Sequence, residues 1–332
     1  MTAPSLDVVA VGSAIVDVLA TAVDADLDGR GLVKGTMALV DAARADELYA
    51  GMGPAVEVSG GSAANTVAGV ASFGGRAAFI GKVRDDQLGQ VFTHDIRATG
   101  VGFDTAPATS GPATARCLVF VTPDAQRTMT TYLGAATGLG PLDIDTRVIA
   151  AARFTYLEGY LWDPPEAISA LRVAMGAAEG AGREVALSLS DPFCVDRHRK
   201  DFLHLIDNDV DVLFANEAEL MSLFEVASLP EALEAVRHRG RCRLAAVTLG
   251  PSGSKVITAD ATIDCPAVPV EHVVDTTGAG DLYAAGFLFG LASGAGPDAC
   301  AHFGSLAAAE VISHVGARPQ VPLATLVARP PG

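Results

Sequence analysis

The sequence holds a glycine-rich turn followed at once by an acid, and these residue types can do chemistry together. The turn is Gly278-Ala279-Gly280-Asp281, and an apolar, helix-compatible segment follows it. Small residues let successive backbone N–H groups approach a ligand, because no bulky side chain stands in the way. At the start of a helix such N–H groups lack partners, and the helix dipole favours an anion. The turn therefore predicts an anion site with Asp281 beside it, in the first turn of a helix.

A carboxylate in that position is suited to phosphoryl transfer. Asp281 can accept the proton of an attacking hydroxyl while the N–H groups of the turn hold the transferred phosphoryl group. General-base assistance is typically worth about 10²–10⁴-fold in rate. The alternative is a structural helix cap, because Asp and Gly are common at helix starts. The segment Asp275-Thr276-Thr277, with a strand-like run ahead of it, favours the catalytic interpretation.

Two other phosphate-binding patterns are missing from the sequence. No GxxxxGK[ST] pattern occurs, and the stretch 75–82 has the wrong spacing. The GxGxxG pattern fails because Tyr283 stands where its third glycine is needed. We therefore do not expect a Walker-type ATPase or a dinucleotide-dependent dehydrogenase.

The composition is typical of a layered α/β protein. Half of the 332 residues are hydrophobic, only 6% are aromatic, and 35 are glycine. Such a chain can form one large domain or two medium ones, and it matches neither disorder, collagen nor a coiled coil. The five cysteines form no CxxC pair, so we expect buried small side chains rather than disulfides or a zinc site.

The charge and the apolar pattern limit the partners. With a formal net charge of −16, the chain repels polyphosphate backbones, so nucleic acid is not an expected partner. ATP can bind only where local dipoles and a few cations reverse the overall field. We expect no signal peptide and no membrane span, and the expected location is the cytoplasm.

Apolar runs alternate with helix-compatible segments along most of the chain. This alternation predicts a doubly wound, largely parallel α/β sheet with helices on both faces. The predicted strands lie at 6–11, 77–83, 154–157, 184–188, 210–215 and 247–249, and the predicted helices at 60–73, 165–178, near 199–207 and from 217.

A second, smaller unit interrupts this alternation. Residues 116–121 and 128–133 are β-prone and flank a polar turn, so they predict a hairpin apart from the parallel core. We expect a β lid built from 18–58, which is less regular, and 107–134. The main domain would then comprise 1–17, 59–106 and 135–332. Ligands of open α/β sheets lie beyond the carboxyl ends of the strands, where such a lid would cover them.

Two separated motifs resemble those of the ribokinase-type (PfkB) carbohydrate and nucleoside kinases. Asp275–Asp281 (DTTGAGD) resembles the C-terminal signature of that family, and Gly60–Asn65 (GGSAAN) resembles its N-terminal signature. The similarity extends over nearly the whole chain. It implies an ATP-dependent kinase with an alcohol group as acceptor.

The resemblance also implies which residues bind the acceptor. In the family a strand-end acid, here Asp17, and an amide, here Asn65, hydrogen-bond sugar hydroxyls, which a carboxylate and an amide can do together. Gly61 and Ser62 belong to the same site, with Gly61 letting the sugar approach the backbone. The structural alternatives are a loop acid for Asp17 and a helix cap for Asn65.

On the nucleotide side the resemblance implies ATP and Mg²⁺ as ligands. Asn216 would lie near the phosphates, and Glu219 would orient Mg²⁺ through water, since that ion keeps several waters. Acids in the first turn of a helix are the alternative. Thr248, Gly250 and Gly253 resemble the ATP-binding turn, the alternative being a plain β-turn. Asp275 and the region around Gly316 resemble a monovalent-cation site, taking K⁺.

Within the family, the segment 126–135 resembles the lid of the adenosine kinases. By that resemblance Arg127 reaches toward the phosphates, and Met129 and Leu133 cover the base. A cation at the phosphate site also suits an acidic protein. Phe193 would add an aromatic wall. Ser13 departs from the branch, which usually carries Asn there, so the contact with the base or sugar would differ.

The predicted function is transfer of phosphate from ATP to a primary hydroxyl, first of all the 5′-hydroxyl of adenosine or a related nucleoside. A sugar kinase for a ribose- or fructose-like substrate is the alternative within the same chemistry. A non-catalytic nucleotide-binding protein on the same fold is the alternative from another class. The chain would work as a monomer or a homodimer, and the sequence leaves that choice open.

Overall fold

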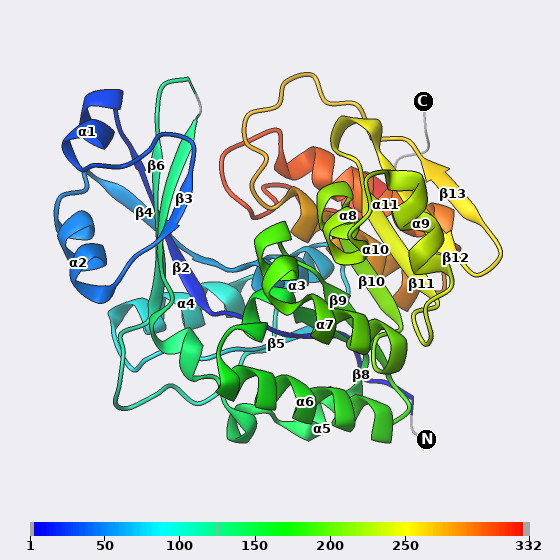
Figure 1. Cartoon of the computed structure of the whole chain (residues 1–332). Helices are drawn as coiled ribbons and strands as arrows, with labels where there is room; N and C mark the ends of the chain where they lie inside the picture. Colours follow the sequence, from blue (N-terminus) through cyan, green and yellow to red (C-terminus); the bar gives the residue numbers. More distant parts are fainter. Residues whose placement is uncertain (1–2, 125, 328–332) are drawn as a thin grey trace.

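The computed structural model describes residues 3–124 and 126–327, which form two β-sheets with flanking helices. Figure 1 shows a large sheet surrounded by helices and a smaller sheet that stands beside it. The chain passes between the two units several times, so each is built from separate stretches of sequence. The arrangement confirms the predicted α/β class with a small β lid.

The large sheet has eight strands within the described residues, in the order β13-β12-β11-β10-β9-β8-β1-β5. The pairs from β11 to β5 are parallel, and β12 and β13 add an antiparallel edge. The strands are β1 (Leu6–Val11), β5 (Ala77–Ile80), β8 (Ala152–Glu158), β9 (Glu184–Ser188), β10 (Val212–Asn216), β11 (Leu244–Thr248), β12 (Ser254–Thr258) and β13 (Thr262–Cys265).

Both faces of this sheet are covered, which explains its nearly continuous apolar strands. In β1, Val8 and Ala10 belong to one buried cluster, whereas Val9 and Val11 belong to the other. The helices that accompany the first cluster are α3 (Ser62–Ser72), α4 (Gln87–Ala98), α10 (Ala279–Ala292), α11 (Pro297–Val311) and the short α12 (Ala324–Val327). Those that accompany the second are α5 (Thr146–Ala151), α6 (Pro165–Gly180), α7 (Pro192–Asn208), α8 (Glu217–Phe224) and α9 (Leu229–Arg237).

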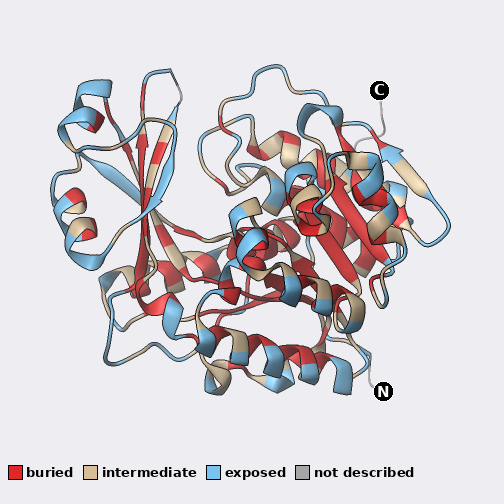
Figure 2. Ribbon diagram, viewed as in Figure 1, coloured by how far each residue is buried: buried red, intermediate tan, exposed pale blue. Residues whose placement is uncertain are grey.

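The small sheet, called the lid sheet below, has the strand order β3-β7-β6-β2-β4. One of its faces packs on two short helices through Val16, Val18, Leu27 and Leu48. The other face is partly open, and Figure 2 shows exposed residues on the outer strands. Its elements are β2 (Ile15–Thr21), α1 (Asp24–Gly29), β3 (Met37–Leu39), α2 (Ala42–Ala50), β4 (Ala55–Gly60), β6 (Ala115–Val121) and β7 (Arg127–Tyr132).

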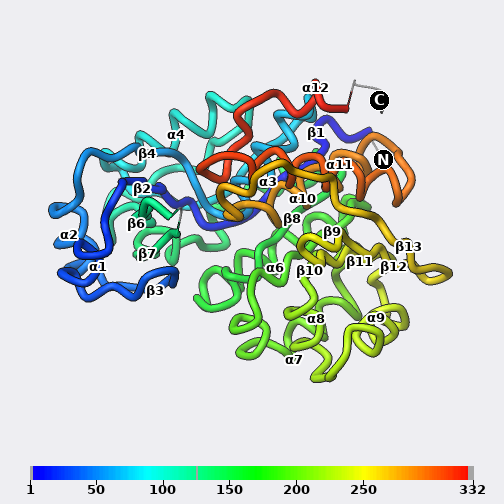
Figure 3. The backbone as a smooth tube through the Cα atoms, turned by 90° about the horizontal axis from the view of Figure 1, so that it is seen from above, coloured from blue at the N-terminus to red at the C-terminus, as the bar shows by residue number. Residues whose placement is uncertain are grey.

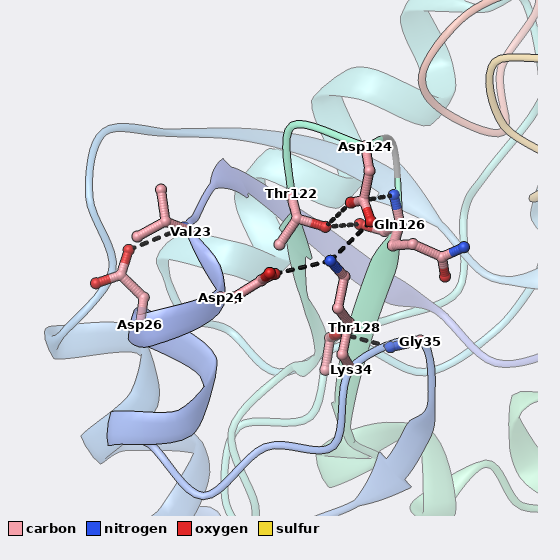
Figure 4. A network of polar contacts seen from close by, with 9 residues as sticks. All are labelled: Val23, Asp24, Asp26, Lys34, Gly35, Thr122, Asp124, Gln126 and Thr128. Atoms are coloured by element: carbon pink, nitrogen blue, oxygen red, sulfur yellow. Dashed lines mark hydrogen bonds and ion pairs between the residues drawn. The ribbon is translucent and has the colours of Figure 1, made fainter.

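A polar network ties together the tip of the lid sheet (Figure 4). The Lys34 ammonium lies 2.7 Å from a carboxylate oxygen of Asp24, at the start of α1, and 2.7 Å from one of Asp124, in the turn after β6. The Thr128 hydroxyl accepts a hydrogen bond from the Gly35 N–H at 3.0 Å. Three separate segments are therefore joined at the rim of the lid, by the exposed Lys34 ion pairs and by the buried Thr128 hydroxyl.

Several predicted elements agree with the structure, and others differ for identifiable reasons. Strands β1 and β9 have the predicted bounds, and β6 and β7 form the predicted antiparallel hairpin. The expected helix near 199–207 is the second half of α7, which begins at Pro192 and has a kink at His198. The edge hairpin β12–β13 was not predicted, because its strands are short and partly exposed.

The stretch 18–58, expected to be less regular, contains two helices and three strands or parts of strands. The lid sheet also takes in residues 15–17 of β2 and 59–60 of β4, which the sequence analysis placed in the main domain. The division into domains remains a prediction. All five cysteines are buried and unpaired. Across the part of the chain that the structure describes, we find no helix with the length and apolarity that a membrane crossing requires.

Candidate active site

A cavity of about 260 Å³ lies at the carboxyl ends of the central strands, beside the start of α10. Side chains and backbone from the large sheet, α3 and α10 line it. The lining includes the predicted site residues Ser62, Asn216, Glu219, Thr248, Gly278, Gly280 and Asp281. Seven residues predicted to serve the acceptor, the nucleotide or the chemistry are thus brought to one space.

Asp281 lies in the first turn of α10, and two side chains from α3 hold its carboxylate. The Ser62 hydroxyl donates to Oδ1 at 2.7 Å, and the Asn65 amide donates to Oδ2 at 2.9 Å. Helices α3 and α10 pack together beside the large sheet (Figure 3), which makes these contacts possible across more than 200 residues of sequence. Burial raises the pKa of Asp281, while the bonds from Ser62 and Asn65 and the charge of Arg318 oppose that rise. Each carboxylate oxygen still has room to accept one further proton donor.

The glycine turn begins helix α10 as the sequence predicts, but the Ala279 N–H, one of the expected anion donors, is bonded to the Thr276 oxygen at 3.2 Å. Gly278 is the residue before α10 and has φ of 80°, in the left-handed region that favours glycine. A Cβ there would lie 2.7 Å from the Cβ of Ala317, so space also demands glycine. Among the described residues, the backbone N–H groups of Gly280 and Asp281 have no hydrogen-bond acceptor. Free N–H groups at a helix start can hold an anion.

The Asp275 carboxylate holds this turn in place through two hydrogen bonds. Its Oδ1 accepts from the Thr277 N–H at 3.0 Å, and its Oδ2 accepts from the Gly316 N–H at 2.9 Å. Arg127, from strand β7 of the lid sheet, forms an ion pair with Asp275 and lies 3.3 Å from the Thr277 hydroxyl. The lid therefore contacts the anion turn through a cation. The predicted monovalent-cation role of Asp275 and phosphate role of Arg127 remain predictions.

On the acceptor side, Asp17 lies inside β2 and not at the end of a strand, because β2 starts at Ile15, after a turn of only three residues. Burial raises the pKa of its carboxyl to about 6, with Arg318 and Arg127 opposing. In the described parts of the chain this carboxylate has no hydrogen-bond partner. The Oδ1 of Asn65 is buried and also has no hydrogen-bond partner.

Gly61 has a structural requirement that the sequence analysis did not anticipate. Its φ is 97°, and a Cβ would lie 2.2 Å from the backbone oxygen of Ser13. Glycine is therefore needed for the close passage of two chain segments. Its predicted role in letting a sugar approach is neither required nor opposed by this contact.

Two charged residues of the site were missed in the sequence analysis. Glu158, at the end of β8, accepts from the N–H groups of Ser13 at 2.7 Å and Ala63 at 2.9 Å. Burial raises its pKa, and these two N–H groups oppose the rise. Arg318 donates to the backbone oxygens of Ser59 and Ala64. Glu158 follows an apolar strand, which is a weak signal, and Arg318 has no local signal at all.

On the nucleotide side, Asn216 and Glu219 form a reciprocal helix cap at the start of α8. The Glu219 carboxylate accepts from the Asn216 N–H at 3.0 Å and from its amide at 2.6 Å, and the Asn216 oxygen accepts from the Glu219 N–H at 2.9 Å. Burial raises the pKa of Glu219 to about 7, with the Asn216 N–H opposing. A buried carboxylate at a cavity wall without a cation partner suits a hydrated divalent ion. The described residues contain no cluster of three or more acid, His or Cys side chains that could hold a metal directly.

The remaining predicted residues lie around the cavity and not in its lining. Gly250 and Gly253 form the turn after Thr248, closed by a 2.8 Å bond from the Leu249 N–H to the Gly253 oxygen. Met129 and Leu133 are half-buried. Phe193 is 76% exposed at the start of α7. Ser13 is buried, and its N–H is taken by Glu158.

Comparison with known proteins gives consistent matches. The profile of the "pfkB family carbohydrate kinase" matches residues 38–324. Adenosine kinase from Saccharomyces cerevisiae is 28% identical over 95% of this chain and 96% of its own.

Solved structures match over nearly the whole chain. Adenosine kinase from Sinorhizobium meliloti is 53% identical, with a TM-score of 0.90 over 97% of this chain and 98% of that one. A probable sugar kinase protein from Rhizobium etli is 46% identical, with a TM-score of 0.91 over 98% of both chains. These similarities confirm the predicted fold class and the resemblance drawn from the two motifs.

Proposed function

The chain belongs to the pfkB family of carbohydrate kinases and is an ATP-dependent kinase that acts on an alcohol, and from this premise we propose that its acceptor is the 5′-hydroxyl of adenosine or a related nucleoside. The relatives include both adenosine and sugar kinases. The choice of acceptor therefore rests on the chemistry of the lid sheet and of the part of the site formed by the starts of α3 and α10, called the floor below.

The floor supports proton transfer from an acceptor hydroxyl to Asp281. Ser62 and Asn65 orient the carboxylate, and its raised pKa brings its basicity nearer to neutral pH. The free N–H groups of Gly280 and Asp281 lie next to it and can stabilise charge that builds up on the phosphoryl group. At the start of α10, the Asp281 carboxylate can therefore act on the acceptor hydroxyl while the free N–H groups act on the phosphoryl group.

Two unpartnered acceptors support a substrate with hydroxyl groups. The Asp17 carboxylate and the Asn65 Oδ1 have no protein partner among the described residues; Asp17 is half-buried, and the Asn65 Oδ1 is fully buried. Leaving buried acceptors unpaired costs stability, so a ligand that supplies O–H donors gains what the protein lacks. Vicinal hydroxyls of a ribose are such donors.

An apolar row across the lid sheet supports a nucleobase attached to that ribose. The proposal of a nucleoside rests mainly on this row. Directly paired residues form the row on all five strands: Val56, Leu19, Val119, Met129 and Met37. It lies on the same face as Asp17 and Arg127, since side chains alternate along each strand. Val56 and Met37 are 64% and 50% exposed. A flat purine can cover such a row, whereas a bare sugar would bring polar edges against it.

The nucleotide would occupy the side lined by Asn216, Glu219 and Thr248. Glu219 would hold Mg²⁺ through water, and the ion would neutralise phosphate charge when bound. Arg127 would leave Asp275 for a phosphate, since a guanidinium binds either anion in the same fork geometry.

A substrate panel tests the proposal. ADP release should be saturable with adenosine and other purine nucleosides at KM values at least about 10-fold below those for ribose or fructose. Turnover with free sugars only would replace the nucleoside by the sugar-kinase alternative. ATP binding without turnover on any of these alcohols would favour a non-catalytic nucleotide-binding protein instead.

A further inference from the structure

Arg318 lies outside both sequence motifs, in the segment between α11 and α12, yet its guanidinium reaches the connection between the lid sheet and the main sheet. Its charge lies close to three carboxyl groups, those of Asp17, Asp95 and Asp281. Burial lowers the pKa of Arg318 to about 10, so the side chain remains cationic at neutral pH. Arg318 thus places a positive charge near three carboxyl groups and at the connection between the two sheets.

Those partners are backbone oxygens and a hydroxyl on both sides of one glycine pair. Nε and Nη2 donate to the Ser59 oxygen at 3.1 and 3.0 Å, and Nη2 also donates to the Ser59 hydroxyl at 3.0 Å. Nη1 donates to the Ala64 oxygen at 2.6 Å. Ser59 belongs to β4 of the lid sheet, and Ala64 to α3 of the main unit. Gly60 and Gly61, with Gly61 at φ of 97°, connect the two.

The same short stretch carries the groups that hold the base. Ser62 and Asn65, which donate to Asp281, flank Ala64 on α3. Asp95 of α4 accepts from the Ser59 N–H at 2.7 Å and from its hydroxyl at 2.6 Å, so the far side of the connection is anchored as well. Freedom at the glycine pair would move α3 relative to α10, and a misplacement of about 1 Å can cost about 10²-fold in rate.

We propose that Arg318 is a positioning residue for the phosphoryl transfer: it clamps the Gly60–Gly61 connection so that Ser62 and Asn65 of α3 hold the Asp281 carboxylate of α10 in place. The proposal rests on the proposed kinase activity, and it assigns the clamp to a residue outside the family's two motifs. A purely structural arginine would account for the hydrogen bonds but not for a change in the ionisation of Asp281.

The groups whose charges act on Asp281 come from several elements, and all must be considered. Arg318 is the cation whose charge lowers the pKa of Asp281. The other titratable groups coupled to Asp281 are Asp17 on β2, Tyr156 and Glu158 on β8, and Tyr160 after it. Arg318 favours the ionised carboxylate, so removing its charge should raise the pKa of Asp281 further.

Two substitutions separate the clamp from the charge. Arg318→Gln removes the charge and most donors, so kcat/KM should fall by about 10²-fold and the acid limb of its pH profile should move to higher pH. Arg318→Lys keeps the charge but cannot bridge Ser59 and Ala64, so the limb should stay while kcat falls by about 10-fold. Arg97→Lys is the matched control, because Arg97 donates twice to one backbone oxygen, that of Phe103, away from the site.

An unchanged acid limb in folded Arg318→Gln, or an equal loss in Arg97→Lys, would overturn the proposal. Hydrogen exchange of the amides of residues 59–65 provides a readout that needs no substrate. Faster exchange in Arg318→Gln and Arg318→Lys, but not in Arg97→Lys, supports the clamp even if wild-type protein turns over no tested alcohol. That result would refute the proposed kinase substrate but not the clamp. Unchanged exchange in both Arg318 variants would refute the clamp but not the proposed function.

Discussion

The floor of the site and the open face of the lid sheet differ in how many of their polar groups have hydrogen-bond partners within the protein. On the floor, Asp281, Glu158 and Arg318 have protein hydrogen-bond partners. On the lid face, the Asp17 carboxylate has no hydrogen-bond partner among the described residues, and the ends of the apolar row are exposed. The floor is preorganised for chemistry, whereas the lid face is completed only when a substrate covers it.

This difference predicts how substitutions divide between rate and affinity. Changes on the floor remove interactions needed in the transition state, so they should lower kcat. Changes on the lid face remove contacts made equally to bound substrate and transition state, so they should raise KM with little effect on kcat.

The largest effect is expected on the floor, from Asp281→Asn. The amide is similar in shape but cannot accept the proton, so kcat should fall by at least about 10²-fold while adenosine binding changes little. Steady-state kinetics and calorimetric titration measure the two quantities. Asp298→Asn, in the first turn of α11, is a control at an equivalent helix position outside the cavity. Wild-type turnover by Asp281→Asn would remove the base assignment.

The position of Asp281, the proposed base, could be predicted from sequence because everything that defines it is local. The turn, its helix and its acid occupy a few consecutive residues, and the structure places them as expected. Strand β1 was equally accessible, since a run of apolar residues buried on both faces has a simple pattern.

The supports of the base could not be predicted, because their partners are far apart in the chain. Glu158 meets the Ser13 N–H across 145 residues, and Arg318 meets Ser59 across 259. No pattern around either residue indicates such a contact. The lid helices were missed for a different reason: α1 and α2 have only 6 and 9 residues, too few for a clear helical period.

Asp17→Asn should have the next largest effect, this time on affinity. The change leaves an amide where an unpartnered carboxylate would accept substrate hydroxyls, so KM for the acceptor should rise by about 10–100-fold and KM for ATP should not. Because the pKa of Asp17 is raised to about 6, protonation below that pH should weaken acceptor binding in the wild type as well. A KM for adenosine that is flat from pH 7 to about 5 would contradict this role.

Met129→Ser tests the apolar row more gently. A polar side chain in the middle of the row removes apolar contact with a base but not with a sugar, so KM for adenosine should rise by about 5–10-fold. KM for ribose, however weak, should stay within about 2-fold. Equal changes for both substrates would show that the row does not recognise a base. Val33→Ser is the control, an exposed apolar residue of the lid unit outside the row.

The smallest effect is expected at the rim of the lid, from Lys34→Ala. Lys34 joins Asp24 and Asp124 (Figure 4), but the side chains of both acids are more than half exposed, and such pairs are screened by water and salt. The melting temperature should fall by only about 1–2 °C, with kcat/KM unchanged. Lys82→Ala breaks a pair with Asp143 in the main unit, where both side chains are about 15% exposed, and should cost about 2–4 °C. Thermal melts at low and high salt compare the two, and only the Lys34 effect should vanish at high salt. If Lys34→Ala lowered the melting temperature more than Lys82→Ala, the rim of the lid would contribute substantially to stability. The contrast between a preorganised floor and a lid face completed by substrate would then be wrong.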